Sequence, residues 1–344
     1  MSGFMAKLTD RAVHILEGKD AIKLLQGITT NDIEKFVSSS QAGLFALFLD
    51  PKGRILCDGM ISKISQFDKT KPVFFIDVHK AHKEFLEAHI QRYAFRKDAT
   101  LHCLDEDMEV QATFSEIILP EEKEGTRQKW EDLDEQLLPK DDEDTLNIHG
   151  YTAFVDPRNK VLGTRTISAK EVLEIDENII KKDANFYNAF RMLAGICEGP
   201  DTVNHIPHML NFHLLNAISF NKGCYVGQEL IARTHTQGIL RTITIPFIAN
   251  SNLENFDQSL FVPISLYESN DYMVKQGEKI LDIEGKTIGQ VISCNKNIGL
   301  AKVKIESSEG KALFADGVSL NLFKPLWLSE VYSDDKDGNR RIEN

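Results

Sequence analysis

The stretch Asn221-Lys-Gly-Cys-Tyr-Val-Gly-Gln-Glu-Leu-Ile-Ala-Arg-Thr-His235 gathers a thiol, an ammonium, an amide, a carboxylate and two glycines in one short segment. The residues before it, Ala217 to Phe220, predict the end of a buried strand. From Gly227 onward the spacing predicts a helix with Leu230 and Ile231 on its apolar side. The segment therefore predicts a strand–loop–helix turn, where backbone N–H groups and the positive end of a helix dipole are exposed.

The composition is that of a globular protein with two or three domains. The chain has 344 residues, of which 42% are hydrophobic and 27% are charged. A formal net charge of -12 argues against non-specific binding to nucleic acid or to an anionic membrane. No apolar run reaches the roughly 18 residues that a membrane span requires. We therefore expect neither nucleic acid nor a membrane among the partners.

The cysteines predict a reducing compartment. Cys57, Cys103, Cys197, Cys224 and Cys294 lie far apart, with no C-x-x-C and no paired spacing. This pattern predicts neither a disulfide framework nor a zinc site. The first residues are too short and too mixed for a signal peptide, and they lack the character of a mitochondrial presequence. If the protein is imported, we expect this sequence to start near the mature end.

Cys224 is the strongest candidate for a functional side chain. Lys222 precedes it by two residues and the predicted helix begins just beyond it, and both features favour a thiolate. Such a thiol can act as a nucleophile, a redox centre or a soft-metal ligand. The alternative, a small buried apolar residue in a packed turn, is equally compatible with these residues. Gln228 and Glu229 can likewise be first-turn residues that the helix dipole favours.

Turn signals divide the rest of the chain. Residues 26–32 predict a helix end followed by a new N-cap, and Asp50-Pro51-Lys52-Gly53 predicts a tight turn between strands at 42–49 and 55–61. Residues 121–144 form an acidic segment, read as a solvated insertion or as a docking surface. From Arg241 onward, short β-rich pieces predict a small barrel or sandwich.

The common cofactor and catalytic motifs are missing. The sequence has no phosphate loop, no G-x-G-x-x-G, no H-E-x-x-H and no G-x-S-x-G. The pairs His79/His82 and His205/His208 have no cysteine or carboxylate at a useful offset, so we interpret them as surface histidines.

Residues 222–229 resemble the K-G-C-[FY]-x-G-Q-E signature of the YgfZ-type proteins, relatives of the glycine-cleavage aminomethyltransferase (T protein). Further segments resemble motifs of the same family: 25–32 its LQG-x-x-TND turn, 50–54 its PKGR hairpin, 92–96 its RY-x-LR segment and 156–163 its D-x-R…LG pair.

The resemblance implies an α+β fold, a ring of three domains around a central channel as in the aminomethyltransferase family. We assign 1–50 with 150–242 to a discontinuous first domain that carries the signature. Residues 51–149 form a ferredoxin-like second domain with the acidic insertion 121–144. Residues 243–333 form a C-terminal β-barrel, and 334–344 a disordered tail.

Within the family, the acidic insertion and Thr234-His235 resemble the eukaryotic mitochondrial branch, whose members are iron–sulfur cluster assembly factors that work with A-type scaffold proteins on [4Fe–4S] clusters. The resemblance implies a protein of the mitochondrial matrix, monomeric on its own, that assists assembly rather than catalysing a transfer. Cys224 would be the functional thiol, tuned by Lys222, and a ligand of a [2Fe–2S] or [4Fe–4S] cluster shared with a partner.

The resemblance also implies tetrahydrofolate in the channel. The residues that would face the channel or a cofactor are Lys222, Gly223, Tyr225, Gly227, Gln228, Glu229, Asn31, Arg54, Arg158 and Arg191. The last three either meet the glutamyl tail of folate or are ion-paired surface residues.

Two departures from the family bear on this cofactor. Met209 stands where the family often has a glutamate suited to the pterin, and Cys57-Asp58 stands where the transferases have paired acids. Three functions follow: an assembly factor, a tetrahydrofolate-dependent one-carbon transferase, or a binding module whose signature loop is purely structural.

Overall fold

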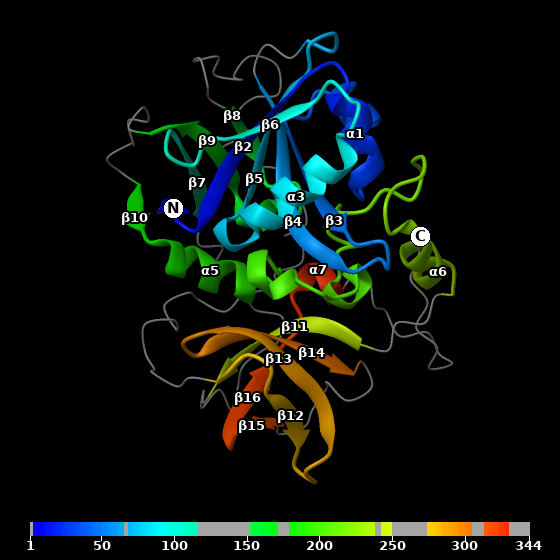
Figure 1. Cartoon of the computed structure of the whole chain (residues 1–344). Helices are drawn as coiled ribbons and strands as arrows, with labels where there is room; N and C mark the ends of the chain where they lie inside the picture. The colour runs from blue at the N-terminus through cyan, green and yellow to red at the C-terminus, as the bar shows by residue number, and fades with distance from the viewer. Residues whose placement is uncertain are drawn as a thin grey trace, which may run out of the picture.

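The computed structural model describes residues 3–64, 68–115, 152–170, 179–237, 242–249, 274–304 and 313–329. Two packed β-sheets with their helices form the upper body in Figure 1, and a small barrel lies below it. The acidic segment 121–144 and the tail 334–344 lie outside the described residues. Across the described chain, no helix is long and apolar enough to cross a bilayer.

One sheet, called here the helix-covered sheet, is antiparallel with the strand order β3-β4-β5-β2-β6. Three helices pack on one of its faces, and its other face packs on the second sheet. Its elements are β2 (Arg11–Glu17), β3 (Gly43–Leu49), β4 (Ile55–Lys63), β5 (Val73–His79), β6 (Thr100–Cys103), α1 (Ala21–Ile28), α2 (Ile33–Val37), η1 (Lys80–His82) and α3 (Lys83–Tyr93).

Strand β3 shows why this sheet needs continuous apolar strands. Leu44, Ala46 and Phe48 pack under the helices, whereas Phe45 and Leu47 pack on the second sheet. Because both faces are covered, the whole strand is buried and reads as an unbroken apolar run.

The two turns predicted near this sheet are confirmed. The 50–53 turn joins β3 to β4, with Gly53 at a φ of +79°. Asp32 caps α2, since its side chain accepts a hydrogen bond of 3.0 Å from the backbone N–H of Lys35.

The second sheet, called here the mixed sheet, has the order β10-β1-β7-β9-β8. Only β1 and β10 run parallel; the other neighbours are antiparallel. Helix α5 packs against it and carries Phe186, Tyr187 and Phe190 into the shared core. The elements are β1 (Gly3–Lys7), β7 (Met108–Ser115), β8 (Thr152–Val155), η3 (Lys160–Leu162), β9 (Thr164–Ala169), β10 (Ile180–Lys182) and α5 (Ala184–Leu193).

The sheets divide the chain differently from the domain bounds that we expected. Residues 11–103 supply the helix-covered sheet, whereas residues 3–7 and 108–182 supply the mixed sheet. The expected boundary at 50/51 falls inside the β3–β4 hairpin, whose two strands pair along their length. The turn signal at 50–53 correctly predicted a hairpin, and the boundary taken from the family resemblance divides that hairpin.

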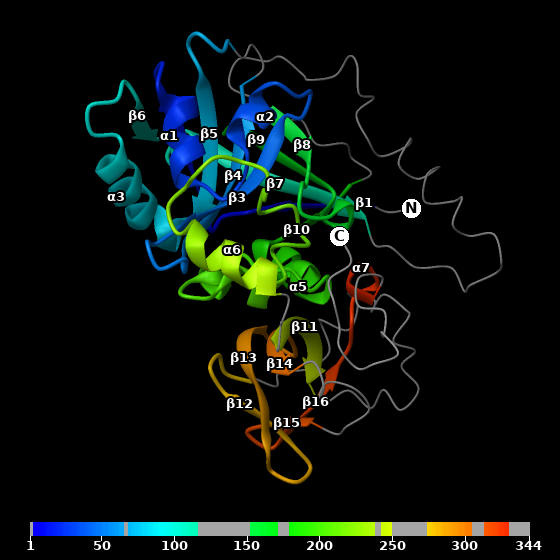
Figure 2. The same ribbon diagram turned by 90° about the vertical axis from the view of Figure 1, so that its right-hand side faces the viewer.

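The predicted C-terminal barrel is confirmed. Its strands close in the order β11-β14-β13-β12-β15-β16, because β16 pairs back onto β11. Helix α5 contacts the barrel through β11, β13 and β14, and both views place the barrel below this helix (Figures 1 and 2). The elements are β11 (Thr242–Ala249), β12 (Lys279–Asp282), β13 (Thr287–Asn295), β14 (Ile298–Lys304), β15 (Leu313–Ala315), β16 (Val318–Leu322) and α7 (Leu326–Ser329).

A buried ionic cluster joins the two sheets. It is called here the Glu198 network and consists of Arg11, Arg158, Arg165, Asp77, Asp156 and Glu198. Glu198 accepts from all three guanidinium groups, with Nη1 of Arg11 at 3.2 Å and Nη2 of Arg165 at 3.1 Å. The three positive and three negative charges balance, which a buried cluster requires.

The network crosses the interface between the sheets. Asp77 of β5 accepts from Nε of Arg11 on β2 at 2.6 Å and from Nη1 of Arg165 on β9 at 3.0 Å. Arg158, which follows β8, also donates to the hydroxyl of Tyr187 on α5 at 3.1 Å. One set of charges therefore fixes both sheets and α5 relative to one another.

Replacing Glu198 with glutamine removes the anion that all three arginines share. We expect the Glu198→Gln variant to lose roughly 3–5 kcal/mol of unfolding free energy, because guanidinium groups are left buried with too little negative charge. Urea denaturation at pH 7 measures the loss. Glu284→Gln, in an exposed turn of the barrel, is the control and should change little.

The pH dependence gives a second readout of the same variant. Burial opposes ionisation of Glu198, yet Arg165, Arg158 and Arg11 hold its pKa well below the usual value. A carboxyl with a depressed folded-state pKa stabilises the fold above its unfolded pKa of about 4.3, and this contribution is lost as the pH falls further. The stability gap between wild type and Glu198→Gln should therefore narrow below that pH. A stability difference between the two proteins that stays constant down to pH 3 contradicts a depressed pKa for Glu198.

Candidate functional site

The signature loop rests on the segment that follows α1. Thr30 donates through Oγ1 to the carbonyl of Ala217 at 2.6 Å, and its own carbonyl accepts from the N–H of Ser219 at 3.0 Å. Asn31 donates through Nδ2 to the carbonyls of Phe45 at 2.9 Å and Asn216 at 2.6 Å. Residues 217–219 are therefore held as irregular chain against this segment, and the strand end predicted there is wrong.

Lys222 fastens the loop to the same segment. Its Nζ donates to the carbonyl oxygens of Gln26, Thr29 and Asn31 at 2.8, 2.8 and 2.6 Å. All three ammonium donors therefore lie on backbone acceptors at the end of α1. Burial lowers the pKa of Lys222 to about 8, while Asp32 and Glu34 act in the opposite direction.

This arrangement gives Lys222 a structural role besides the one that we expected. The sequence places its charge two residues from Cys224 and predicts that it tunes the thiol. In the structure its three donors are directed at the 26–31 backbone, so Lys222 holds the loop in place.

Two glycines permit the close contact between the loop and the β3–β4 turn. A Cβ on Gly227, at a φ of +81°, would lie 2.6 Å from the carbonyl oxygen of Asp50. A Cβ on Gly53 would lie 2.7 Å from Cβ of Leu230. Both distances are far shorter than a real contact allows, so each position requires glycine. The signature and the PKGR-type turn are thus complementary halves of one contact.

Helix α6 (Gln228–Gln237) begins directly after this contact, as predicted. Gln228 accepts through Oε1 from the N–H of Tyr225 at 3.1 Å, and Ile231 is buried. The ammonium of Lys222 lies 4.9 Å from the ring centre of Tyr225, and burial raises the pKa of Tyr225 to about 12. Glu229 is exposed in the first helical turn.

Cys224 lies at the exposed part of this fixed loop. Its thiol is free and exposed, and nothing lies within 4 Å of a Cβ built on the neighbouring Gly223. Within the described residues, Cys224 belongs to no set of three His, Cys, Asp or Glu side chains that could hold a metal ion. The loop therefore presents one thiol to the outside without further metal ligands of its own.

The three arginines proposed for folate are not gathered around Cys224. Arg158 belongs to the Glu198 network, and Arg191 of α5 pairs with Asp201 at 2.7 Å and donates to the carbonyl of Ile196 at 3.0 Å. Both guanidinium groups are buried. Arg54 is exposed and donates to the carbonyl of Asn204 at 2.7 Å.

These residues do not fit a folate site. Nε, Nη1 and Nη2 of Arg158 and Nε and Nη1 of Arg191 donate to protein acceptors, and the Asn31 amide donates to backbone carbonyls. Asp58, the remaining acid of the transferase pair, is fully buried, and its Oδ1 accepts from the N–H of Gly199 at 2.9 Å and the hydroxyl of Thr202 at 3.2 Å.

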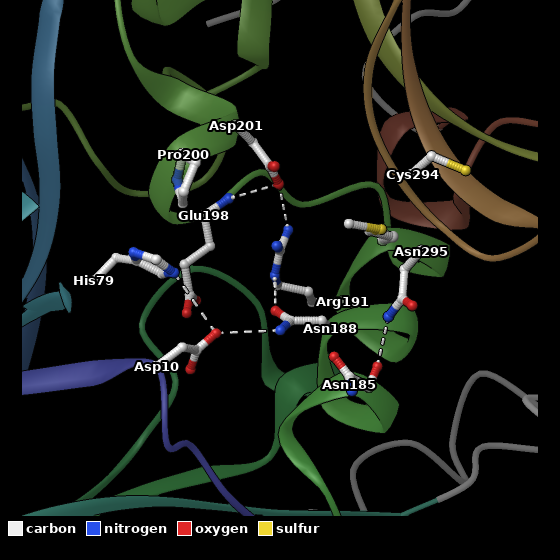
Figure 3. A pocket seen from close by; sticks show the side chains of 11 residues that line it. Asp10, His79, Asn185, Asn188, Arg191, Glu198, Pro200, Asp201, Cys294 and Asn295 are labelled. Atoms are coloured by element: carbon white, nitrogen blue, oxygen red, sulfur yellow. Dashed lines mark hydrogen bonds and ion pairs between the residues drawn. The ribbon is translucent and has the colours of Figure 1, made fainter. Parts of the chain in front are cut away.

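A polar pocket of about 250 Å³ lies elsewhere, beside α5 and η4 (Gly199–Thr202) and close to the barrel. Figure 3 shows its polar side chains bonded to one another: Asp10 to Asn188, and Arg191 to Asp201. No residue of 216–237 lines it. Of the residues that the sequence analysis proposed for a cofactor, Arg191 lines this pocket; its other walls come from strand ends, α5 and the barrel, which sequence reasoning did not bring together.

Sequence reasoning also missed a cluster of aromatic rings around the signature loop. His208 of η5 (Pro207–Leu210) stacks on His213 at 4.9 Å between ring centres, and Phe220 stacks on His235 of α6 at 3.7 Å. Burial lowers the pKa of His208 to about 4 and that of His213 to about 3.

The interpretation of two histidines as surface residues is therefore wrong. His208 is fully buried and His82 is nearly so. Each belongs to a short 3-10 helix, which is too brief to show a periodic apolar pattern that would have predicted burial.

Comparisons with known proteins support the relationship expected from the signature. Residues 261–330 match the family model described as CAF17, C-terminal beta-barrel domain. A Dictyostelium discoideum protein named iron-sulfur cluster assembly factor IBA57 homolog, mitochondrial, is 29% identical over 266 residues, covering 70% of this chain and 61% of that protein. The chain thus spans less than two thirds of this relative.

Proteins of the same name from two fungi align over more of the chain. The Mycosarcoma maydis protein is 27% identical and covers 88% of this chain and 74% of its own length. The Neurospora crassa protein is 26% identical, with 95% and 82% covered. The expected resemblance to YgfZ-type proteins, and within them to mitochondrial iron–sulfur cluster assembly factors, is confirmed.

A solved structure identifies the fold. The glycine cleavage system aminomethyltransferase T from Bartonella henselae superposes with a TM-score of 0.61 at 12% identity, covering 99% of this chain and 88% of that one. The predicted α+β fold of the aminomethyltransferase family, with its C-terminal β-barrel, is confirmed.

The paired glycines yield a test within the loop itself. Gly227→Ala should destabilise the loop by at least about 1–2 kcal/mol, because a non-glycine residue is strained at positive φ and its Cβ meets Asp50. Hydrogen exchange of residues 216–237 measures the loosening. Gly223→Ala is the matched control, since its Cβ has open space. Equal exchange in the two variants contradicts the proposed contact.

Proposed function

We propose that this protein is an iron–sulfur cluster assembly factor that assists the formation of [4Fe–4S] clusters and the maturation of [4Fe–4S] enzymes. It would act in the mitochondrial matrix together with A-type scaffold proteins. The observation that carries the proposal is the exposed Cys224 thiol on a loop fixed by Lys222, Thr30 and the paired glycines. Two relatives that align over 88% and 95% of this chain are named mitochondrial iron-sulfur cluster assembly factors.

The chemical role proposed for Cys224 is to bind an iron atom of the cluster. The thiol loses its proton and the thiolate donates to an iron of the cluster, which is cargo rather than a resident cofactor. A single cysteine cannot complete the coordination of a [2Fe–2S] or [4Fe–4S] cluster. The remaining ligands would come from the A-type partner or from a small thiol, and the open space around Gly223 leaves room for such an approach.

A rigid loop suits a thiol that must ligate a cluster better than a flexible loop does. Binding that must order a loop loses part of its free energy to conformational entropy. Here the hydroxyl of Thr30 and the ammonium of Lys222 hold the chain before the thiol, and the N–H of Val226, which donates to the carbonyl of Gly27 at 3.0 Å, holds the chain after it. The partner would meet a preformed surface, with Glu229 and the start of α6 beside it.

We infer that the protein assists assembly without catalysing one-carbon transfer. Cys57 occupies the place of one transferase acid, and Asp58 is buried with two donors already bound to one of its oxygens. A general acid or base must reach the proton that it transfers. Neither side chain meets that requirement here.

The family resemblance predicts tetrahydrofolate binding, and the burial of two of the proposed arginines argues against it. Because Arg158 and Arg191 are buried in ion pairs, we expect titration calorimetry with tetrahydrofolate to give no saturable heat at micromolar concentrations. A tight one-to-one isotherm would restore the transferase alternative.

The role of Cys224 is tested by complementation. Cys224→Ala should fold normally, because the side chain is exposed, but should fail to restore aconitase-type activity in a strain that lacks the endogenous protein. Cys294→Ser, at a cysteine of the barrel, is the control and should complement. Normal [4Fe–4S] enzyme activity with Cys224→Ala contradicts the proposal.

Anaerobic reconstitution with an A-type scaffold protein then tests ligation directly. A visible and Mössbauer spectrum that appears only when both proteins are present, and is lost in Cys224→Ala, supports a shared cluster. An unchanged spectrum in that variant removes the thiol from the coordination shell.

A further inference from the structure

We propose that His14, Glu87 and Cys103 form a binding site for a divalent transition-metal ion of the zinc type, separate from the signature loop. One ligand atom from each of the three side chains lies within 4.8 Å of the others. Nε2 of His14 and Oε1 of Glu87 are 3.1 Å apart. The proposal does not rest on the function proposed for Cys224.

The fold brings the three donors together from distant parts of the chain. His14 on β2 and Cys103 on β6 are directly paired residues of neighbouring antiparallel strands, so their side chains share one face of the sheet. Glu87 comes from α3, which packs over that face. Because two donors lie on paired strands, hydrogen bonding of the sheet fixes their separation before any metal binds.

The donor set matches a borderline metal. Imidazole, thiolate and carboxylate are the ligands of zinc, which binds them with bonds of about 2.0–2.3 Å. In a tetrahedral site those bond lengths place ligand atoms roughly 3.4–3.6 Å apart. The His14–Glu87 separation of 3.1 Å is already close to that value, so small side-chain movements complete the arrangement.

The burial pattern suits an ion that enters from solvent. His14 is fully buried and forms a fixed anchor, whereas Cys103 is exposed and the Glu87 side chain is 42% exposed. Three protein ligands leave a fourth position toward the outside for water or another donor.

Lys83, one turn before Glu87 on α3, competes for the same thiol. Interaction with the Cys103 thiol raises the pKa of the Lys83 ammonium, so the two groups are neighbours. The cation and the metal ion cannot share the thiolate, so Lys83 must swing away when the ion binds. Its removal should therefore strengthen metal binding, which a site of accidental surface ligands would not show.

The test titrates the full-length protein, freed of metal with a chelator, with Zn²⁺ by calorimetry. Cys103→Ser and Glu87→Gln should each weaken the affinity by at least about tenfold, since losing even an outer-shell partner costs that much. Lys83→Gln should tighten it several-fold. Co²⁺ in place of Zn²⁺ should give a thiolate-to-cobalt charge-transfer band that is lost in Cys103→Ser, and an anaerobic Fe²⁺ titration establishes which metal is preferred.

Two controls separate this site from others. His102 is exposed and next to Cys103 in sequence, but its side chain is on the opposite face of β6 and lies near Glu17. The His102→Ala variant should therefore bind Zn²⁺ with unchanged affinity. Cys224→Ser should also bind Zn²⁺ normally. Equal Zn²⁺ affinity in Cys103→Ser and wild type, loss of binding in Cys224→Ser, or a Co²⁺ complex without the thiolate band overturns the proposal.

Discussion

The Glu198 network is the interaction on which the rest of the structure depends. Burying three guanidinium groups is tolerable only if each finds an anion, and one carboxylate, Glu198, contacts all three. The requirement fixes the distance between β5 of the helix-covered sheet and β9 of the mixed sheet, which an apolar interface alone would leave free to slide. Because Glu198 is held in place, the start of the chain segment that leads from it to the signature loop is also fixed.

The same constraint reaches the exposed thiol through the backbone. Asp156 and Arg158 belong to the network, and the carbonyl of Pro157 between them accepts from Nδ2 of Asn216 at 3.0 Å. The carbonyl of Asn216 in turn accepts from Asn31, whose own carbonyl holds Lys222. A continuous set of hydrogen bonds therefore runs from the charged core to the loop that bears Cys224.

Sequence reasoning predicted what depends on local chemistry and missed what depends on assembly. The turn at 50–53, the cap at Asp32, the start of α6 and the barrel all follow from glycine, proline and capping side chains that act within a few residues. The expected domain boundary at 50/51 was wrong because it was taken from the family resemblance and divides a hairpin that the turn signal itself predicts. Arg158 was interpreted as a folate ligand or a surface ion pair and His208 as a surface histidine, since only the packed fold shows that Glu198 neutralises one and that His213 stacks on the other.

The five cysteines show how the fold assigns different chemistry to one side chain. Burial raises the pKa of Cys57 and of Cys197 well above the usual value, so these thiols are inert packing groups. Cys103 and Cys224 are the exposed ones. Cys103 has a histidine and a carboxylate of its own chain beside it, and such a set can hold an ion without help. Cys224 has none within the described residues, so any metal centre that it joins must be completed from outside. A thiol that is exposed, rigidly held and lacking companion ligands is suited to a cluster that passes between proteins, because a full set of its own ligands would retain the cluster.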